Sequence, residues 1–172
     1  GASVAARLRR LDEKAEIILF EKGEYISYAN CGLPYYLGGV IEERDRLFVQ
    51  TPDSFKARFR VEVRTRHEVK MIDPEKKLLL VRELSTGREY YESFDKLVLS
   101  PGAEPVRPPL EGIGCAGIFT LRNVADTDRI KNWMERHEVR QAVVVGAGFI
   151  GLEMAENLKQ AGIDVTVVEM AE

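Results

Sequence analysis

The sequence has little of the features that mark specialised protein classes. Its 172 residues include only two cysteines, Cys31 and Cys115. Two cysteines make no disulfide framework and fit a reducing cytoplasm. No apolar run approaches the roughly 18 residues that span a bilayer, and no signal peptide is visible. A net charge of -3 gives no reason to expect nucleic acid or a membrane surface as a partner. No metal site is predicted either.

What is present is typical of a globular α/β protein, with 45% hydrophobic and 31% charged residues. Both ends look cut, because Gly1-Ala2-Ser3 reads as the inside of a helix and Glu172 comes just after a strand. We therefore expect a segment of a longer protein, truncated at both ends.

The clearest motif is a dinucleotide fingerprint near the end of the sequence. Ala142–Val145 predicts a buried strand that runs into Gly146-Ala147-Gly148-Phe149-Ile150-Gly151, the G-x-G-x-x-G pattern. A helix over 152–161 and a second strand over 165–168 should follow. Glu169 then supplies the acid that such units place after the second strand.

Each motif residue has a physical task in binding a dinucleotide. Gly146 permits a tight turn, Gly148 lets a pyrophosphate reach the backbone, and Gly151 lets helix and strand pack closely. The pyrophosphate would lie at the helix N-terminus. Glu169 would accept a hydrogen bond from the ribose 2′-hydroxyl and repel a 2′-phosphate, so the sequence predicts NADH rather than NADPH.

The start of the sequence repeats this layout. Gly1 precedes an expected helix over 2–11, a buried strand over 15–20 and then Glu21. Gly1 and Glu21 would be the last glycine and the acid of a second dinucleotide unit. Two such units around one thiol suggest a flavin and a nicotinamide that serve that thiol.

The candidate thiol is Cys31, in Ser27-Tyr28-Ala29-Asn30-Cys31-Gly32-Leu33-Pro34-Tyr35-Tyr36. It stands where a helix is expected to begin, and a helix N-terminus favours the thiolate that attacks disulfides. The alternative is an ordinary buried cysteine, which most free cysteines are.

One helix face carries two arginines and a hydroxyl. Ser3, Arg7 and Arg10 share a side of the helix over 2–11, and they fit either a phosphate site or a solvated surface.

Other elements follow from local signals. Thr51 and Pro52 predict the cap and first residue of a helix that continues through Arg58. Strands are expected at 60–66, at 78–84 and 88–94 around a Ser85-Thr86-Gly87 turn, and at 97–99. The proline-rich 105–109 reads as a crossing between domains, and 124–137 reads as a helix.

The Cys31 segment resembles the active-site segment of the single-cysteine pyridine nucleotide-disulfide oxidoreductases. This group includes coenzyme A-disulfide reductases, NADH-dependent persulfide and polysulfide reductases, NADH oxidases and NADH peroxidases. Further similar blocks are His67-Glu68-Val69, Asp95 to Ala103, Phe119 to Asn123 and Gly148 to Glu153.

The resemblance implies two Rossmann-like domains, a FAD domain over 1–108 that includes the hairpin and the start of an NADH domain over 109–172. It implies Cys31 as the redox nucleophile and a homodimer. FAD would be held by Gly1, Glu21, Lys22, Val69, Ser100 and Gly102. Coenzyme A would be held by Ser3, Arg7, Arg10, Ser27 and Asn30.

The resemblance leaves the electron acceptor open. Residues 32–36 contain no second cysteine, so a mixed disulfide or a sulfenic acid must replace an internal disulfide. Coenzyme A disulfide or persulfide is favoured by the arginine face, and oxygen or peroxide is the nearest alternative. A non-catalytic redox sensor is a further alternative. Cys115 has no partner by spacing and is expected to be structural.

Overall fold

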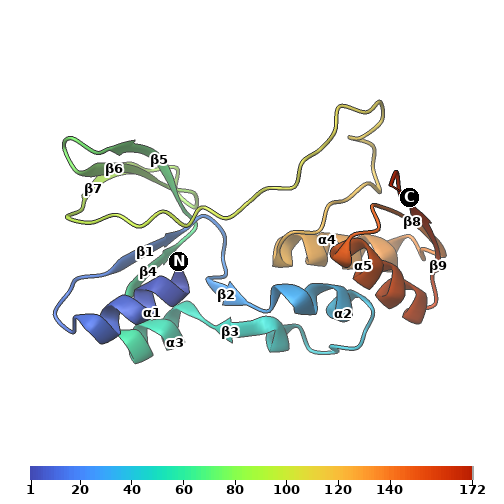
Figure 1. Cartoon of the computed structure of the whole chain (residues 1–172), viewed down its shortest axis with the longest axis horizontal. Coiled ribbons are helices and arrows are strands. Elements are labelled where there is room, and N and C mark those ends of the chain that lie inside the picture. Colours follow the sequence, from blue (N-terminus) through green and yellow to red (C-terminus); the bar gives the residue numbers. More distant parts are fainter. Residues whose placement is uncertain (172) are drawn as a thin grey trace. The chain divides into compact units, whose positions relative to one another are not determined.

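Figure 1 shows the computed structural model, which describes residues 1–171. The chain forms two compact units. The first contains Gly1–Tyr28 and Phe48–Gly102, and the second contains Ala29–Leu47 and the chain from Ala103 onward. Both units combine helices with strands, so the α/β class is confirmed. The domain boundary at residue 108 and the division into FAD and NADH domains stay predictions.

The first unit is built on a parallel strand pair. Strand β1 (Ile18–Glu21) pairs with β4 (Glu62–Thr65). Helix α1 (Ala2–Leu11), with the predicted bounds, contributes Ala5 and Ala6 to a core with Phe55 and Val61. The strand begins later than residue 15, because the Asp12 carboxylate accepts the backbone N–H groups of residues 14 and 15 in a turn.

Helix α3 (Pro52–Phe59) starts as the sequence predicts. The Thr51 side chain accepts the Ser54 backbone N–H at 3.2 Å, and the Ser54 hydroxyl oxygen accepts the Thr51 N–H at 3.0 Å. This capping box satisfies two backbone donors that would otherwise lack partners. The helix ends one residue past the predicted Arg58, where Arg60 adopts a left-handed φ of 49°.

The predicted hairpin is part of a three-stranded antiparallel sheet, β5–β6–β7 (Figure 1). Strands β6 (Leu78–Glu83) and β7 (Glu89–Ser93) flank the expected turn, in which the Gly87 N–H donates to the Glu83 carbonyl at 2.8 Å. Strand β5 (His67–Asp73) and the short antiparallel pair of β2 (Ser27–Tyr28) and β3 (Phe48–Gln50) were not predicted from the sequence.

The predicted buried strand at Leu97–Leu99 is wrong. None of these residues is part of a strand ladder within residues 1–171, and Val98 and Leu99 are 54% and 67% exposed. An apolar run becomes a strand only where a neighbouring strand takes up its N–H and C=O groups.

The second unit holds the fingerprint elements. Strand β8 (Gln141–Val145), helix α5 (Phe149–Gln160) and strand β9 (Asp164–Val168) form a β-α-β unit with parallel strands, which confirms the predicted order. Helix α4 (Val124–Arg136) and the short helix α2 (Leu33–Leu37) belong to the same unit. The core joins α2, α4 and α5 through Leu37, Ile130, Met154, Leu158 and Ile163.

The prediction that β8 is a buried strand is only half right. Ala142 and Val144 pack on the core, whereas Val143 and Val145 are 65% and 82% exposed. The side chains of a strand alternate between its two faces, and in this unit helices cover one face only. Within residues 1–171, no helix has the length and apolar character needed to cross a membrane.

Candidate cofactor and thiol sites

The turn between β8 and α5 can be built only with glycine at two positions. Gly146 has a φ of +100°, and its N–H donates to the Val168 carbonyl at 2.8 Å, which ties the turn to β9. A Cβ atom on Gly151 would lie 1.9 Å from the Gly146 carbonyl oxygen. Any larger side chain at Gly151 would push the helix away from the strand, so both glycines have the roles expected of a dinucleotide turn.

The N-terminus of α5 has room for an anion. Gly148 is the N-cap residue, and no side chain caps the helix through a hydrogen bond. A Cβ atom added to Gly148 would have no other atom within 4 Å. Phe149, the first helical residue, is 91% exposed. Unpaired backbone N–H groups and the positive end of the helix dipole are what a pyrophosphate needs, so these residues fit the dinucleotide.

Glu169 is fixed at the edge of this turn. Its carboxylate accepts the Ala147 N–H at 2.6 Å, and its other oxygen accepts the Met170 and Ala171 N–H groups at 2.7 and 2.9 Å. These hydrogen bonds, the one from Ala147 first, lower the pKa of Glu169 below 4.5. The acid that follows β9 is therefore a carboxylate at neutral pH, held against the glycine turn.

The corresponding acid of the first unit is arranged differently. Gly1 is the N-cap of α1, and Glu21 ends β1 and accepts the Gly23 N–H at 2.7 Å. Lys22 forms an ion pair with Glu68 at 3.1 Å, and this contact lowers the pKa of Glu68. The remaining predicted FAD residues also belong to this unit and are solvent-exposed, namely Val69 on β5 and Ser100 and Gly102 after it.

The arginines of helix α1 differ in their exposure and their contacts. Ser3, Arg7 and Arg10 are exposed, as their common face predicts. Arg9 is 9% exposed, and its guanidinium donates to four backbone carbonyl oxygens, including those of Phe59 and Arg60 at 2.9 Å each. Arg9 therefore fastens α1 to the end of α3, whereas Arg7 and Arg10 present their charge to solvent.

Cys31 lies in a 3₁₀ turn, Asn30–Gly32, that leads into α2. The expected position at a helix start is confirmed, although α2 is only five residues long. Cys31 is exposed and not part of a disulfide, so the alternative of a buried cysteine is wrong. Asn30 precedes it and is exposed, and Ser27 lies on β2 in the first unit. Cys115 is exposed as well.

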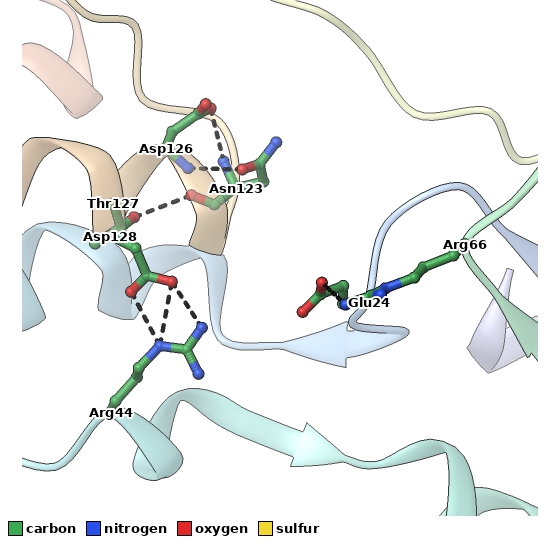
Figure 2. A network of polar contacts seen from close by, with 7 residues as sticks. All are labelled: Glu24, Arg44, Arg66, Asn123, Asp126, Thr127 and Asp128. Atoms are coloured by element: carbon green, nitrogen blue, oxygen red, sulfur yellow. Dashed lines mark hydrogen bonds and ion pairs between the residues drawn. The ribbon is translucent and has the colours of Figure 1, made fainter. Parts of the chain in front are cut away.

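Sequence reasoning missed a polar network on α4 (Figure 2). Asn123 caps the helix by accepting the Asp126 N–H at 2.9 Å, and the Asp126 carboxylate accepts the Asn123 N–H in return. Arg44 reaches Asp128 with both Nε and Nη2, at 2.9 and 2.7 Å from its oxygens. The capping box had a local signal in Asn123 and Asp126. The Arg44 pair had none, because 84 positions separate its members.

The family model of pyridine nucleotide-disulphide oxidoreductases matches residues 1–172. The chain belongs to this family. Its curated relatives include the coenzyme A disulfide reductase of Staphylococcus haemolyticus, with 43% identity over 172 residues. The chain spans 38% of that relative's length.

Solved structures of family members have the same fold. Reduced CoADR-RHD of Bacillus anthracis is 55% identical with a TM-score of 0.97, over 99% of this chain and 31% of that one. The NAD-dependent persulfide reductase of A. fulgidus is 39% identical with a TM-score of 0.94, over 100% of this chain and 32% of its own.

Members of an oxidase type are similar at lower identity. The water-forming NADH oxidase of Lactobacillus brevis, solved with NADH, is 30% identical with a TM-score of 0.88, over 98% of this chain and 37% of that one. An engineered form of it is a water-forming NADPH oxidase, and the engineered changes include a glycine and an aspartate 18 positions further along.

Glu169 predicts a pH dependence. Since the folded protein lowers its pKa below 4.5, the carboxylate stabilises the fold above about pH 4.5, and this contribution disappears as the pH falls through the folded pKa. We expect Glu169→Gln to be less stable than the wild type at pH 7 and the difference to vanish in acid. Urea unfolding between pH 7 and pH 3 measures the difference. A difference that grows in acid would contradict the hydrogen-bonded carboxylate.

Proposed function

We propose that this chain is part of an NADH- and FAD-dependent reductase that acts on coenzyme A disulfide, or on coenzyme A persulfide or polysulfide, through Cys31. The observation that carries the proposal is the free, exposed thiol of Cys31 at a helix start, with no second cysteine in residues 32–36. The high identity to CoADR-RHD and to a coenzyme A disulfide reductase supports the substrate class.

The chemistry for Cys31 is thiol–disulfide exchange. Its thiolate would attack one sulfur of coenzyme A disulfide, forming a mixed disulfide and releasing one coenzyme A thiolate, which takes up a proton. When bound, FAD would pass two electrons from NADH to this mixed disulfide, which then releases the second thiol. Because Cys31 is exposed, a large disulfide has access to its sulfur.

The cofactor residues stay as the sequence analysis proposes. For FAD they are Gly1, Glu21, Lys22, Val69, Ser100 and Gly102, and for NADH they are Gly146, Gly148, Gly151 and Glu169. Cytoplasmic location and a homodimer of the full-length protein are also part of the proposal.

Glu169 supports a preference for NADH. The carboxylate is ionised and held at the glycine turn, where a 2′-phosphate would meet its negative charge. The engineered NADPH oxidase is consistent with this, since a glycine and an aspartate 18 positions apart were changed in it, and Gly151 and Glu169 have the same separation.

We therefore expect Glu169→Ala combined with Met170→Arg to change the cofactor preference. Loss of the carboxylate removes the partner of the 2′-hydroxyl, and the arginine adds a partner for a 2′-phosphate. The ratio of kcat/KM for NADH to that for NADPH should fall about tenfold or more. Glu156→Ala removes an exposed carboxylate from helix α5 and is the control. An unchanged ratio in the double variant would refute the role of Glu169.

The arginine face of α1 gives a second prediction, for the coenzyme A phosphates. Replacing Arg7 and Arg10 by Gln should raise KM for coenzyme A disulfide about tenfold, as expected for two exposed charge contacts of about 0.7 kcal/mol each. Lys56→Gln with Arg58→Gln removes two exposed cations from α3 and is the matched control. If both double variants have the same KM as the wild type, Arg7 and Arg10 do not bind coenzyme A, and the helix face that they form is a solvated surface.

The decisive test of function is steady-state NADH oxidation by the full-length protein. Coenzyme A disulfide, coenzyme A persulfide and dissolved oxygen are offered as acceptors in parallel. We expect a coenzyme A species to be reduced fastest, and Cys31→Ser to abolish that activity because no thiolate remains to attack sulfur. Cys115→Ser, the other exposed cysteine, should retain it.

Two outcomes would point elsewhere. Oxygen reduction to water as the fastest reaction would indicate an NADH oxidase, the activity of the L. brevis neighbour. Failure of NADH to bleach the flavin absorbance would indicate a non-catalytic redox sensor.

A further inference from the structure

The segment that carries Cys31 is a closed loop with its own support. It runs from Ala29 to Leu47, and the Ala29 N–H closes it by donating to the Leu47 carbonyl at 2.8 Å. Leu47 has an exposure of 0%, and its side chain lies under the turn, because a Cβ on Gly32 would be 3.1 Å from the Leu47 Cδ2 atom. The residue next to Cys31 is therefore packed directly on Leu47.

Arg44 links this support to helix α4. Arg44 and Leu47 are the two ends of one 3₁₀ turn, Arg44–Leu47. The guanidinium of Arg44 holds the Asp128 carboxylate through two nitrogens, and the side chains of both residues are about two-thirds buried, with 33% and 30% exposed (Figure 2). A forked, partly buried ion pair constrains orientation as well as distance, unlike a single contact in solvent.

The same segment meets α4 and α5 at other points. The Lys131 ammonium lies 3.8 Å from the centre of the Tyr36 ring, and a Cβ on Gly38 would be 2.8 Å from Asn157 of α5. Leu37 is part of the core formed with α4 and α5. These contacts hold helix α2, whereas the ion pair of Arg44 with Asp128 holds the part of the loop that returns beneath Gly32.

We propose that Arg44 and Asp128 are a positioning pair for Cys31: they hold Leu47 beneath the turn and so fix where the thiol meets a bulky sulfur acceptor. The proposal builds on the proposed function of Cys31. Neither side chain needs to touch the substrate. A thiol displaced by about 1 Å reacts far more slowly with a bound partner, while a small diffusing reagent still reaches it.

The test compares Arg44→Gln with Arg46→Gln in the full-length protein. Arg46 is the control because it stands in the same turn, and its ion pair with Glu43 is exposed, 73% and 70% at the two side chains. We expect Arg44→Gln to lower kcat for coenzyme A disulfide about tenfold. KM, the rate of flavin bleaching by NADH and the alkylation of Cys31 by iodoacetamide (measured with Cys115→Ser) should stay within about twofold of the wild type.

Rescue separates positioning from general stability. Asp128→Asn preserves the shape of the side chain and should lower kcat as Arg44→Gln does. The double variant Arg44→Asp with Asp128→Arg, in which the two charges are swapped, should recover part of the lost kcat. The proposal is overturned if Arg44→Gln and Arg46→Gln have equal kcat values. It is also overturned if flavin bleaching falls in parallel with kcat, which would indicate a general structural defect.

The two proposals fail in distinguishable ways. If coenzyme A disulfide, persulfide and polysulfide are all not reduced but another acceptor is reduced in a Cys31-dependent reaction, the proposed substrate class is wrong, and kcat for that acceptor then tests the pair. If Cys31→Ser changes the turnover of no acceptor, the roles of Cys31 and of the positioning pair are both refuted.

Discussion

The close approach of α5 to the end of β8 is the constraint on which the nucleotide-binding features of the second unit depend. A Cβ on Gly151 would lie 1.9 Å from the Gly146 carbonyl oxygen, so the helix can begin there only without a side chain at that position. The turn that results leaves the N-terminal N–H groups of α5 at an open edge. It also presents the Ala147 N–H to Glu169. One steric condition thus sets both the anion site and the orientation of the acid.

The features that could be predicted from the sequence are those decided by neighbouring residues. The N-cap at Thr51, the turn at Gly87 and the strand–glycine–helix order around Gly146 each depend on a few adjacent side chains or dihedral angles. Leu97–Leu99 has the composition of a strand but lacks a hydrogen-bonded neighbour in residues 1–171. Likewise, the sequence of β8 does not predict that Val145 is exposed. Pairing and burial depend on partners that are distant in the sequence.

The arginines show the same limit for the candidate sites. Helical spacing correctly groups Arg7 with Arg10 on an exposed face, but it does not reveal that Arg9 is buried on four carbonyl oxygens. Arg44 belongs to no motif, and its partner Asp128 lies on a helix that is adjacent only after folding. Local sequence patterns can therefore predict which arginines face solvent. They cannot predict the role of an arginine whose partner is distant in the sequence.

The exposed Cys31 thiol, with no second cysteine in residues 32–36, places a particular demand on its surroundings. Under the proposed function, the sulfur partner of Cys31 is a diffusing coenzyme A disulfide or persulfide, so the thiol has to be accessible, and Cys31 is exposed. Accessibility alone would leave the thiol poorly oriented, because orientation within the bound complex supplies much of the rate. The second unit meets both needs with different residues. Cys31 itself is open to solvent, while two later residues of its segment, Leu37 and Leu47, are packed into the protein.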